Sequence, residues 1–357
     1  MMDVSLLITA RQEEFLRNTI ESVLAASRAD TEVIAVLDGA WANPPIPDHP
    51  RVQLVYRPIA IGQRAAVNLA ARLSRGRYVM KLDAHCLLEE GFDLKLIQAD
   101  EEVGRPDLTQ IPAMINLHVF NWRCRVCGRE TYQGPEPAGC QVDAARDAEL
   151  AVMPAACGRT DGFDRVMVWA PRRRKAQGNG SPGAGREART EFWRFDHEMH
   201  FQYHGPCRPG QDKAELADVL SSVGACFFMR RDRFFQIGGL DEGHGSWGNF
   251  GTEIACKSWL SGGRQIVNRR TWFAHLFRTQ GHGFSFPYQI TNAEQDYARR
   301  YSQNLWYGNH WEGQTRPLAW LVDYFKPIRG WHDPVGTAQL AQVHTAGRTF
   351  QPKEGRL

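Results

Sequence analysis

Apolar runs and polar intervals alternate along the first part of the chain in the pattern of a parallel α/β sheet. Four apolar segments predict buried strands, at residues 4–10, 31–37, 52–56 and 77–82. Apolar residues at helical spacing predict two amphipathic helices between them, at residues 13–26 and 65–73. Because strands that alternate with helices form right-handed βαβ units, we expect an α/β fold with a Rossmann-like, mostly parallel sheet.

Polar residues stand where three of these segments end. Thr9 and Arg11 close the first segment. Asp38 follows the second segment, and Asp83 follows the fourth. In open parallel sheets, ligands bind at the carboxyl ends of the strands. These side chains therefore predict a binding site at one edge of the sheet.

The regular pattern stops near residue 117. The next part is rich in Cys, Gly and Pro, and a later stretch, 170–185, is basic and then Gly-rich, which predicts a mobile loop. Regular segments return as a strand at 221–229 and as helices near 232–236 and 252–260. The tail from residue 286 is rich in aromatic residues without clear periodicity. These changes divide the chain into four parts, at residues 1–117, 118–210, 211–288 and 289–357.

Composition narrows the class of protein. Of the 357 residues, 43% are hydrophobic and 11% aromatic, which is enough for a sizeable core and excludes global disorder. No apolar run approaches a length of about 18 residues, as a membrane span needs, and the first residues lack a signal-peptide pattern. We therefore expect a cytoplasmic protein whose eight cysteines are free thiols, metal ligands or catalytic groups.

The net charge of +3 is unevenly distributed. Residues 165–194 contain eight basic and only two acidic residues. The most basic group lies between Trp169 and Trp193 and consists of Arg172, Arg173, Arg174 and Lys175. Basic residues among aromatic ones suit a nucleic-acid backbone with stacked bases. A basic lid that attracts an anionic ligand is the equal alternative.

The spacing of Asp83 and His85 suits a metal site. Residues i and i+2 of an extended segment project to the same side, so one carboxylate and one imidazole can share a divalent cation. Mn²⁺ or Mg²⁺ needs a further protein ligand, for which His275 is the candidate. The alternative is an aspartate that caps the next turn beside a half-buried histidine.

A second carboxylate opens the helix predicted at 252–260. Glu253 follows the segment that contains Trp247. In this position it could act as a general base or bind acceptor hydroxyls. It could equally complement the helix dipole in the first turn, so the sequence leaves both roles open.

Four cysteines in the second part have the spacing of a zinc knuckle. The set that we expect to hold structural Zn²⁺ is Cys124, Cys127, Cys140 and Cys157. His118 or Cys207 could replace the last of them. A Gly- and Pro-rich segment with little hydrophobic core needs a metal ion or a similar cross-link to be stable. The alternative is that the four cysteines are reduced thiols in a loop.

Five motifs occur in the order found in a known family. They are Asp38-Gly39, Asp83-Ala84-His85-Cys86, FQIGGLDE at 235–242, the group around Trp247-Gly248 and Glu253, and His275-Leu276-Phe277-Arg278. With these motifs the chain resembles the GT-A-fold glycosyltransferases, most closely the polypeptide N-acetylgalactosaminyltransferases and their bacterial and phage relatives. The resemblance covers residues 4–117 and 221–278. It implies a metal-dependent glycosyltransferase with a GT-A-like fold, a Cys-rich insertion and a carboxy-terminal extension.

The resemblance also implies roles for single residues. Residues 1–117 would bind a UDP-sugar donor, through Thr9, Arg11, Asp38, Gly62, Asn68 and Asp83. Mn²⁺ or Mg²⁺ on the diphosphate would be held by Asp83, His85 and His275. In the catalytic half, 211–288, Arg278 would neutralise the leaving diphosphate, Trp247 would contact the sugar and Glu253 would face the acceptor. Asn249 departs from the family pattern, which has an acidic residue soon after the Trp-Gly pair.

The acceptor is predicted from the insertion. A zinc knuckle and a basic, aromatic segment favour DNA, in which a hydroxymethylated pyrimidine offers a hydroxyl once the base is flipped out. The alternative acceptor is a protein Ser or Thr or a glycan. A hypothesis of another class is a nucleic-acid-binding protein on an inactive transferase scaffold. Such a protein would not need the metal ligands Asp83, His85 and His275.

Overall fold

A mostly parallel sheet forms the centre of the computed structural model, which describes residues 2–144, 150, 153–172, 189–207, 209–278, 286, 290–329 and 331. The strands of this sheet and its extension are β1 (Val4–Ala10), β2 (Thr31–Asp38), β3 (Val52–Arg57), β4 (Tyr78–Asp83), β5 (Cys86–Leu88), β6 (Leu108–Cys124), β7 (Glu130–Tyr132), β8 (Phe163–Pro171), β11 (Leu216–Asp218), β12 (Cys226–Arg230) and β13 (Arg264–His275). A separate hairpin consists of β9 (Trp193–Phe195) and β10 (Phe201–Tyr203).

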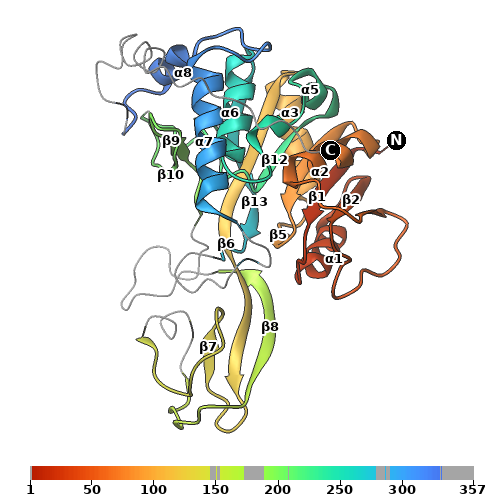
Figure 1. The fold of residues 1–357 in the computed structure, drawn as a ribbon, viewed down its shortest axis with the longest axis vertical. Helices are drawn as coiled ribbons and strands as arrows, with labels where there is room; N and C mark the ends of the chain where they lie inside the picture. The colour runs from red at the N-terminus through yellow and green to blue at the C-terminus, as the bar shows by residue number, and fades with distance from the viewer. Residues whose placement is uncertain are drawn as a thin grey trace.

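The helices pack around this sheet (Figure 1). They are α1 (Leu16–Ala26), α2 (Gln63–Leu73), α3 (Phe92–Val103), α5 (Arg231–Gln236), the 3-10 turn η1 (Glu242–His244), α6 (Phe250–Leu260), α7 (Asn292–Tyr307) and α8 (Leu318–Phe325). Among the helices that the structure describes, none has the length and apolar character needed to cross a membrane.

The strand order is β11-β13-β6-β12-β4-β1-β2-β3. β1 pairs in parallel with β2 and β4, β2 with β3, and β6 with β13, whereas β12 and β11 run antiparallel to their neighbours. Every residue of β2 is buried, as expected for a central strand covered on both faces. The predicted α/β class and mostly parallel sheet are confirmed, and the first four strands and two helices end within three residues of their predicted bounds.

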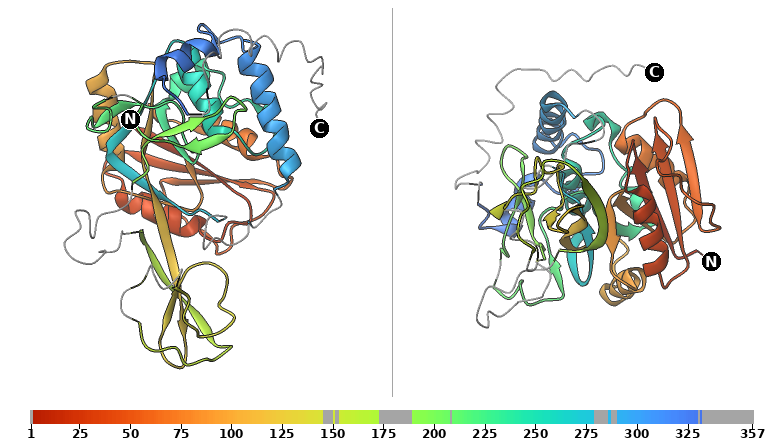
Figure 2. Two further views of the ribbon diagram at one scale, coloured as in Figure 1. Left: turned by 90° about the vertical axis from the view of Figure 1, so that its left-hand side faces the viewer. Right: turned by 90° about the horizontal axis from the view of Figure 1, so that it is seen from below.

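β6 continues through the predicted boundary at residue 117. Its first half pairs with β12 and β13 in the sheet, and its second half pairs with β7 and β8. This second half forms with β7 and β8 an arm that projects from the sheet (Figures 1 and 2). His275, the last residue of β13, stands opposite Asn116. The arm therefore leaves the sheet at the edge where His275 lies.

The aromatic carboxy-terminal part contains two helices that its periodicity did not predict. α7 begins with a capping box, in which Thr291 and Glu294 exchange side-chain and backbone hydrogen bonds. α7 and α8 pack on α6 through a second core that includes Trp259, Trp306 and Phe325 (Figure 1). The carboxy-terminal helices α7 and α8 therefore contact the sheet domain through α6.

Candidate active site

A cavity of about 700 Å³ opens at the carboxyl ends of β1, β2 and β4. The residues predicted for donor binding, metal binding and catalysis that line it are Thr9, Arg11, Asp38, Gly62, Asp83, His85, Trp247, His275 and Arg278. A parallel sheet gathers its ligand-binding residues at this edge because every strand ends there. Asn68 and Glu253 lie elsewhere.

Asp83, His85 and His275 come together at this edge. One ligand atom of each lies within 4.8 Å of the others. His275 Nε2 is 3.2 Å from Asp83 Oδ2. Burial lowers the pKa of His275 to about 4, so its imidazole is neutral, which is the form that binds cations. One carboxylate and two imidazoles therefore form a donor set that suits a divalent cation such as Mn²⁺.

Two further residues hold the carboxylate of Asp83. Lys81 Nζ donates to Asp83 Oδ1 and, at 2.7 Å, to the carbonyl of Gly224. Gln63 Nε2 donates to the same carboxylate oxygen at 3.2 Å. Burial alone would raise the pKa of Asp83, but Lys81 and His275 bring it below its ordinary value. A lysine inside a buried strand is the sequence signal that could have pointed to Lys81.

Glu13 is a site residue that the sequence analysis missed. One of its oxygens accepts a hydrogen bond from Arg278 Nη2 at 2.6 Å, and the other lies 3.0 Å from His85 Nδ1. Burial alone would raise the pKa of Glu13, but His85 and Arg278 lower it. Glu13 follows β1 by three residues, so its place beside Arg11 at the binding edge was the available signal.

Asp38 and Gly62 meet at the start of α2. The carboxylate of Asp38 accepts hydrogen bonds from the backbone N–H groups of Ile61 and Gly62, at 2.7 and 3.0 Å. Asn68 lies in the wall of a second hollow, where its amide exchanges hydrogen bonds with the backbone of Leu240 at 2.8 and 2.9 Å. The predicted donor-binding role therefore does not suit Asn68, because its buried amide connects α2 to the backbone at Leu240.

Glu253 is also placed differently from the prediction. Its carboxylate has no exposed surface and pairs with Arg64 at 2.8 Å and with Lys257 at 3.2 Å. Burial alone would raise the pKa of Glu253, but Lys257 and Arg64 lower it to about 2. The acceptor-side role predicted for Glu253 is thus corrected. The packing of α6 places its carboxylate outside the cavity lining, and the ion pair with Arg64 connects α6 to α2.

The segment around Trp247 is held by the same network. Arg64 donates to the carbonyls of Gly245 and Gly248 at 3.0 and 2.6 Å. The ring of Trp247 is inclined at 70° to the ring of Phe286, with centroids 6.2 Å apart. The cavity also has walls from the β9–β10 hairpin and from α7, which the sequence did not connect with the site. Their lining residues are His200, Phe201, Tyr203, Asn292, Glu294, Gln295, Asp296 and Arg299.

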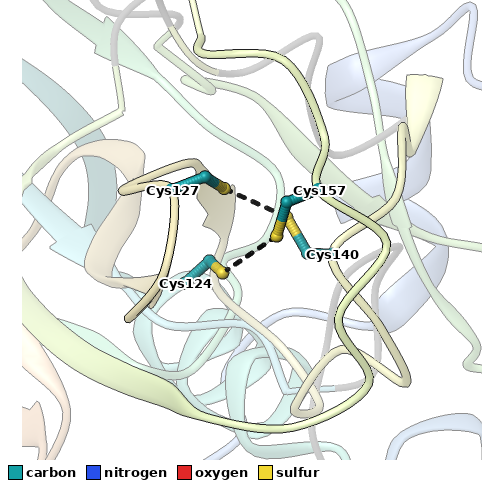
Figure 3. A group of neighbouring side chains, drawn as sticks. All are labelled: Cys124, Cys127, Cys140 and Cys157. Atoms are coloured by element: carbon teal, nitrogen blue, oxygen red, sulfur yellow. Dashed lines mark hydrogen bonds between the residues drawn. The ribbon is translucent and has the colours of Figure 1, made fainter.

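The four cysteines predicted to hold Zn²⁺ meet in the arm, at the end of β6 (Figure 3). The sulfur atoms of Cys124 and Cys157 are 3.7 Å apart. Those of Cys127 and Cys140 are 3.4 Å apart, and all four residues are free thiols. Backbone N–H groups aimed at Cys124 lower the pKa of its thiol to about 7, whereas burial raises the pKa of the Cys140 thiol. His118 and Cys207 are not members of this group.

The basic group lies mostly outside the described residues. Arg172 is described, and its guanidinium lies over the ring of Tyr132 at 5.6 Å. Arg173, Arg174 and Lys175, with most of the predicted mobile loop, lie outside the part of the chain that the structure describes. Of the basic group, the structure therefore describes only Arg172, and the predicted nucleic-acid contact stays a prediction.

Comparison with known proteins relates this site to a family. The model of glycosyl transferase family 2 matches residues 5–122. Probable N-acetylgalactosaminyltransferase 8 of Caenorhabditis elegans is 36% identical over 215 residues, which are 60% of this chain and 37% of that protein. Polypeptide N-acetylgalactosaminyltransferase 10 of Homo sapiens is 33% identical over 87 residues, which are 24% of this chain and 14% of that protein.

A solved structure shows the same fold. The crystal structure of GalNAc-T7 with UDP, GalNAc and Mn²⁺ matches with a TM-score of 0.55 and 16% identity, over 86% of this chain and 48% of that one. The chain spans less than half the length of each of these three proteins. Its sequence match begins in β1 and ends within the first strand of the arm. The chain therefore contains a glycosyltransferase family 2 domain, homologous to the polypeptide N-acetylgalactosaminyltransferases and built on a GT-A-like fold.

Proposed function

We propose that the protein is a metal-dependent glycosyltransferase that moves a sugar from a UDP-sugar to a hydroxyl acceptor. The observation that carries the proposal is the set of Asp83, His85 and His275 within 4.8 Å, at the edge of a family 2 domain where a cavity of about 700 Å³ opens. The fold shared with a protein that was crystallised with UDP and Mn²⁺ supports the classes of donor and metal.

The residues of the cavity have distinct roles in this proposal. A divalent cation held by the three ligands would neutralise the diphosphate as it leaves the sugar. Arg278, whose guanidinium is held in place by Glu13, would donate hydrogen bonds to the same leaving group. Thr9 and Arg11 line the donor side, and Trp247 offers an apolar ring to the sugar.

For the acceptor we propose a hydroxymethylated pyrimidine in DNA. The arm leaves the sheet at the edge where the cavity opens, and the basic group follows the last strand of the arm. Phe201 and Tyr203 line the cavity and could stack on a flipped base. These observations support a nucleic-acid acceptor.

A protein Ser or Thr is the second candidate acceptor. The human relative named above is a polypeptide N-acetylgalactosaminyltransferase by name. In addition, the cavity is lined by the exposed Glu294 and by Asp296, whose side chain is 51% exposed, and both carboxylates would repel a phosphate backbone. These observations support a peptide acceptor, so the test includes both.

We also propose that the four-cysteine group of the arm holds a structural Zn²⁺. Four sulfur atoms that lie within 4.8 Å of one another, in two close pairs, fit a tetrahedral thiolate site. All eight cysteines are free thiols, which suits the cytoplasm as a reducing compartment.

The test is a transfer screen with purified protein, Mn²⁺ and a panel of UDP-sugars. The acceptors are duplex DNA with hydroxymethylated pyrimidines, the same duplex unmodified, and peptides rich in Ser and Thr. A hexose-sized mass gain on the modified nucleoside supports the DNA acceptor, and one on the peptide overturns it. Donor turnover should require Mn²⁺ and should be lost in Asp83→Ala. DNA binding without any donor turnover would identify a binding protein on an inactive scaffold.

A further inference from the structure

We infer that Glu13 is a positioning residue that sets His85 for the metal and Arg278 for the leaving diphosphate. The inference rests on the proposed function, because it assigns Glu13 to the same site. Glu13 acts through the two side chains that it joins, which are 72 and 265 positions away from it in the sequence.

The carboxylate of Glu13 is held rigidly. One of its oxygens accepts both the backbone N–H of Phe15 at 3.1 Å and the guanidinium of Arg278 at 2.6 Å. The other oxygen lies 3.0 Å from His85 Nδ1. The side chains of Glu13 and Arg278 are each only 4% exposed. Water therefore cannot replace either contact without a change in packing.

The chemistry of these partners determines the state of the histidine. An ionised carboxylate only accepts hydrogen bonds, so His85 must carry a proton on Nδ1. A neutral imidazole with that proton keeps its lone pair on Nε2, which is the atom left to bind a cation. The same carboxylate compensates the charge of the buried guanidinium. Glu13 thus prepares a metal ligand and a cationic group together.

Glu13→Gln tests this role, because it replaces one carboxylate oxygen by an NH₂ group and keeps the size of the side chain. Arg278 can only donate, so the amide oxygen stays on Arg278 and the NH₂ group turns to His85 Nδ1. Nδ1 must then accept, and the proton moves to Nε2, where it blocks the ligand lone pair. We expect the dissociation constant for Mn²⁺, measured from the electron paramagnetic resonance of free Mn²⁺, to rise about 10- to 100-fold. The KM for Mn²⁺ in donor turnover should rise in parallel.

Glu14→Gln is the matched control. Glu14 is the next residue, is 41% exposed and pairs with Arg165 at 2.8 Å. Its substitution should leave Mn²⁺ affinity within about twofold of wild type, as expected for an exposed pair. Equal losses in both variants would overturn the inference, because they would show a general effect of charge.

A spectroscopic measurement on the wild-type chain tests the inference without a destabilising change. Protein with ¹⁵N-labelled histidine, free of metal, should show His85 as the Nδ1–H tautomer, assigned by comparison with His85→Gln. An Nε2–H tautomer overturns the inference. If wild type binds no Mn²⁺ at all, the proposed function fails as well. If wild type binds Mn²⁺ and Glu13→Gln binds it equally well, the inference alone fails.

Discussion

His275 Nε2 lies 3.2 Å from Asp83 Oδ2, although 192 positions separate the two residues in the sequence. β4 ends at Asp83, and β13 ends at His275. β13 reaches this point because it pairs in parallel with β6 and antiparallel with β5. The register of these strands, and not the length of the insertion between them, therefore assembles the proposed metal site.

The carboxylate of Asp83 should be indispensable for donor turnover. Asp83→Asn keeps the size of the side chain but removes the charge that attracts a divalent cation. We expect the rate of UDP-sugar turnover in Mn²⁺ to fall by about 100-fold or more, because a bound metal stabilises the leaving group by several kcal/mol. Asp48→Asn, at an exposed position, should keep the wild-type rate. Turnover by Asp83→Asn that still responds to Mn²⁺ would contradict the metal assignment.

The arm should contain one zinc ion per chain. Elemental analysis of protein purified without chelator should find this ion in wild type, and Cys140→Ser should lose it, since a four-thiolate site needs every ligand. Cys207→Ser is the control, because Cys207 lies outside the group, 3.2 Å from His204. Loss of zinc in the Cys207 variant, or a wild-type protein without zinc, would rule out the predicted ligand set.

Glu253 should contribute to stability in a pH-dependent way. Its pKa in the folded protein is about 2, below the ordinary value of 4.5. The contribution, of the order of 3 kcal/mol, is therefore present above pH 4.5 and is lost as the pH falls from 4.5 toward 2.

Urea unfolding of Glu253→Gln measures this contribution. At pH 7 the free energy of unfolding should drop by about 3–5 kcal/mol, because Arg64 is left buried without its partner. The gap to wild type should narrow as the pH falls below 4.5. Glu21→Gln, whose side chain is 52% exposed beside Arg17, should change stability by less than about 0.5 kcal/mol. A gap that widens toward low pH would contradict the assignment.

Gly251 should not tolerate a side chain. A Cβ atom at this position would lie 1.8 Å from the carbonyl oxygen of Ser222, which is backbone and cannot rotate away. We expect Gly251→Ala to lower the free energy of unfolding by about 3 kcal/mol, as overpacking does. Gly205→Ala is the matched control, since nothing lies within 4 Å of its added Cβ. Equal stabilities for both variants in urea unfolding would contradict this packing.

The sheet edge of the site was predictable from the sequence. Asp38 and Asp83 each end a strand that the apolar pattern identifies, and topology alone brings such residues to one edge. His275 was named as the further ligand that a divalent cation needs, the family resemblance implied the same role, and the cysteine group was identified from its spacing. The α7 wall of the cavity was not predicted, although the Thr291–Glu294 capping box was a readable start signal. Glu253 was assigned to the wrong environment because its place in a helix sequence does not reveal which way the helix packs.

By itself the sequence determined the order of buried strands and amphipathic helices and the residue types at the strand ends, because these follow from local periodicity and local chemistry. Only the tertiary structure decided that Glu13 joins His85 to Arg278, and that the carboxylate of Glu253 is buried against Arg64. Those contacts connect residues that are distant in the sequence. They depend on strand register and helix packing, which no local window of the chain contains.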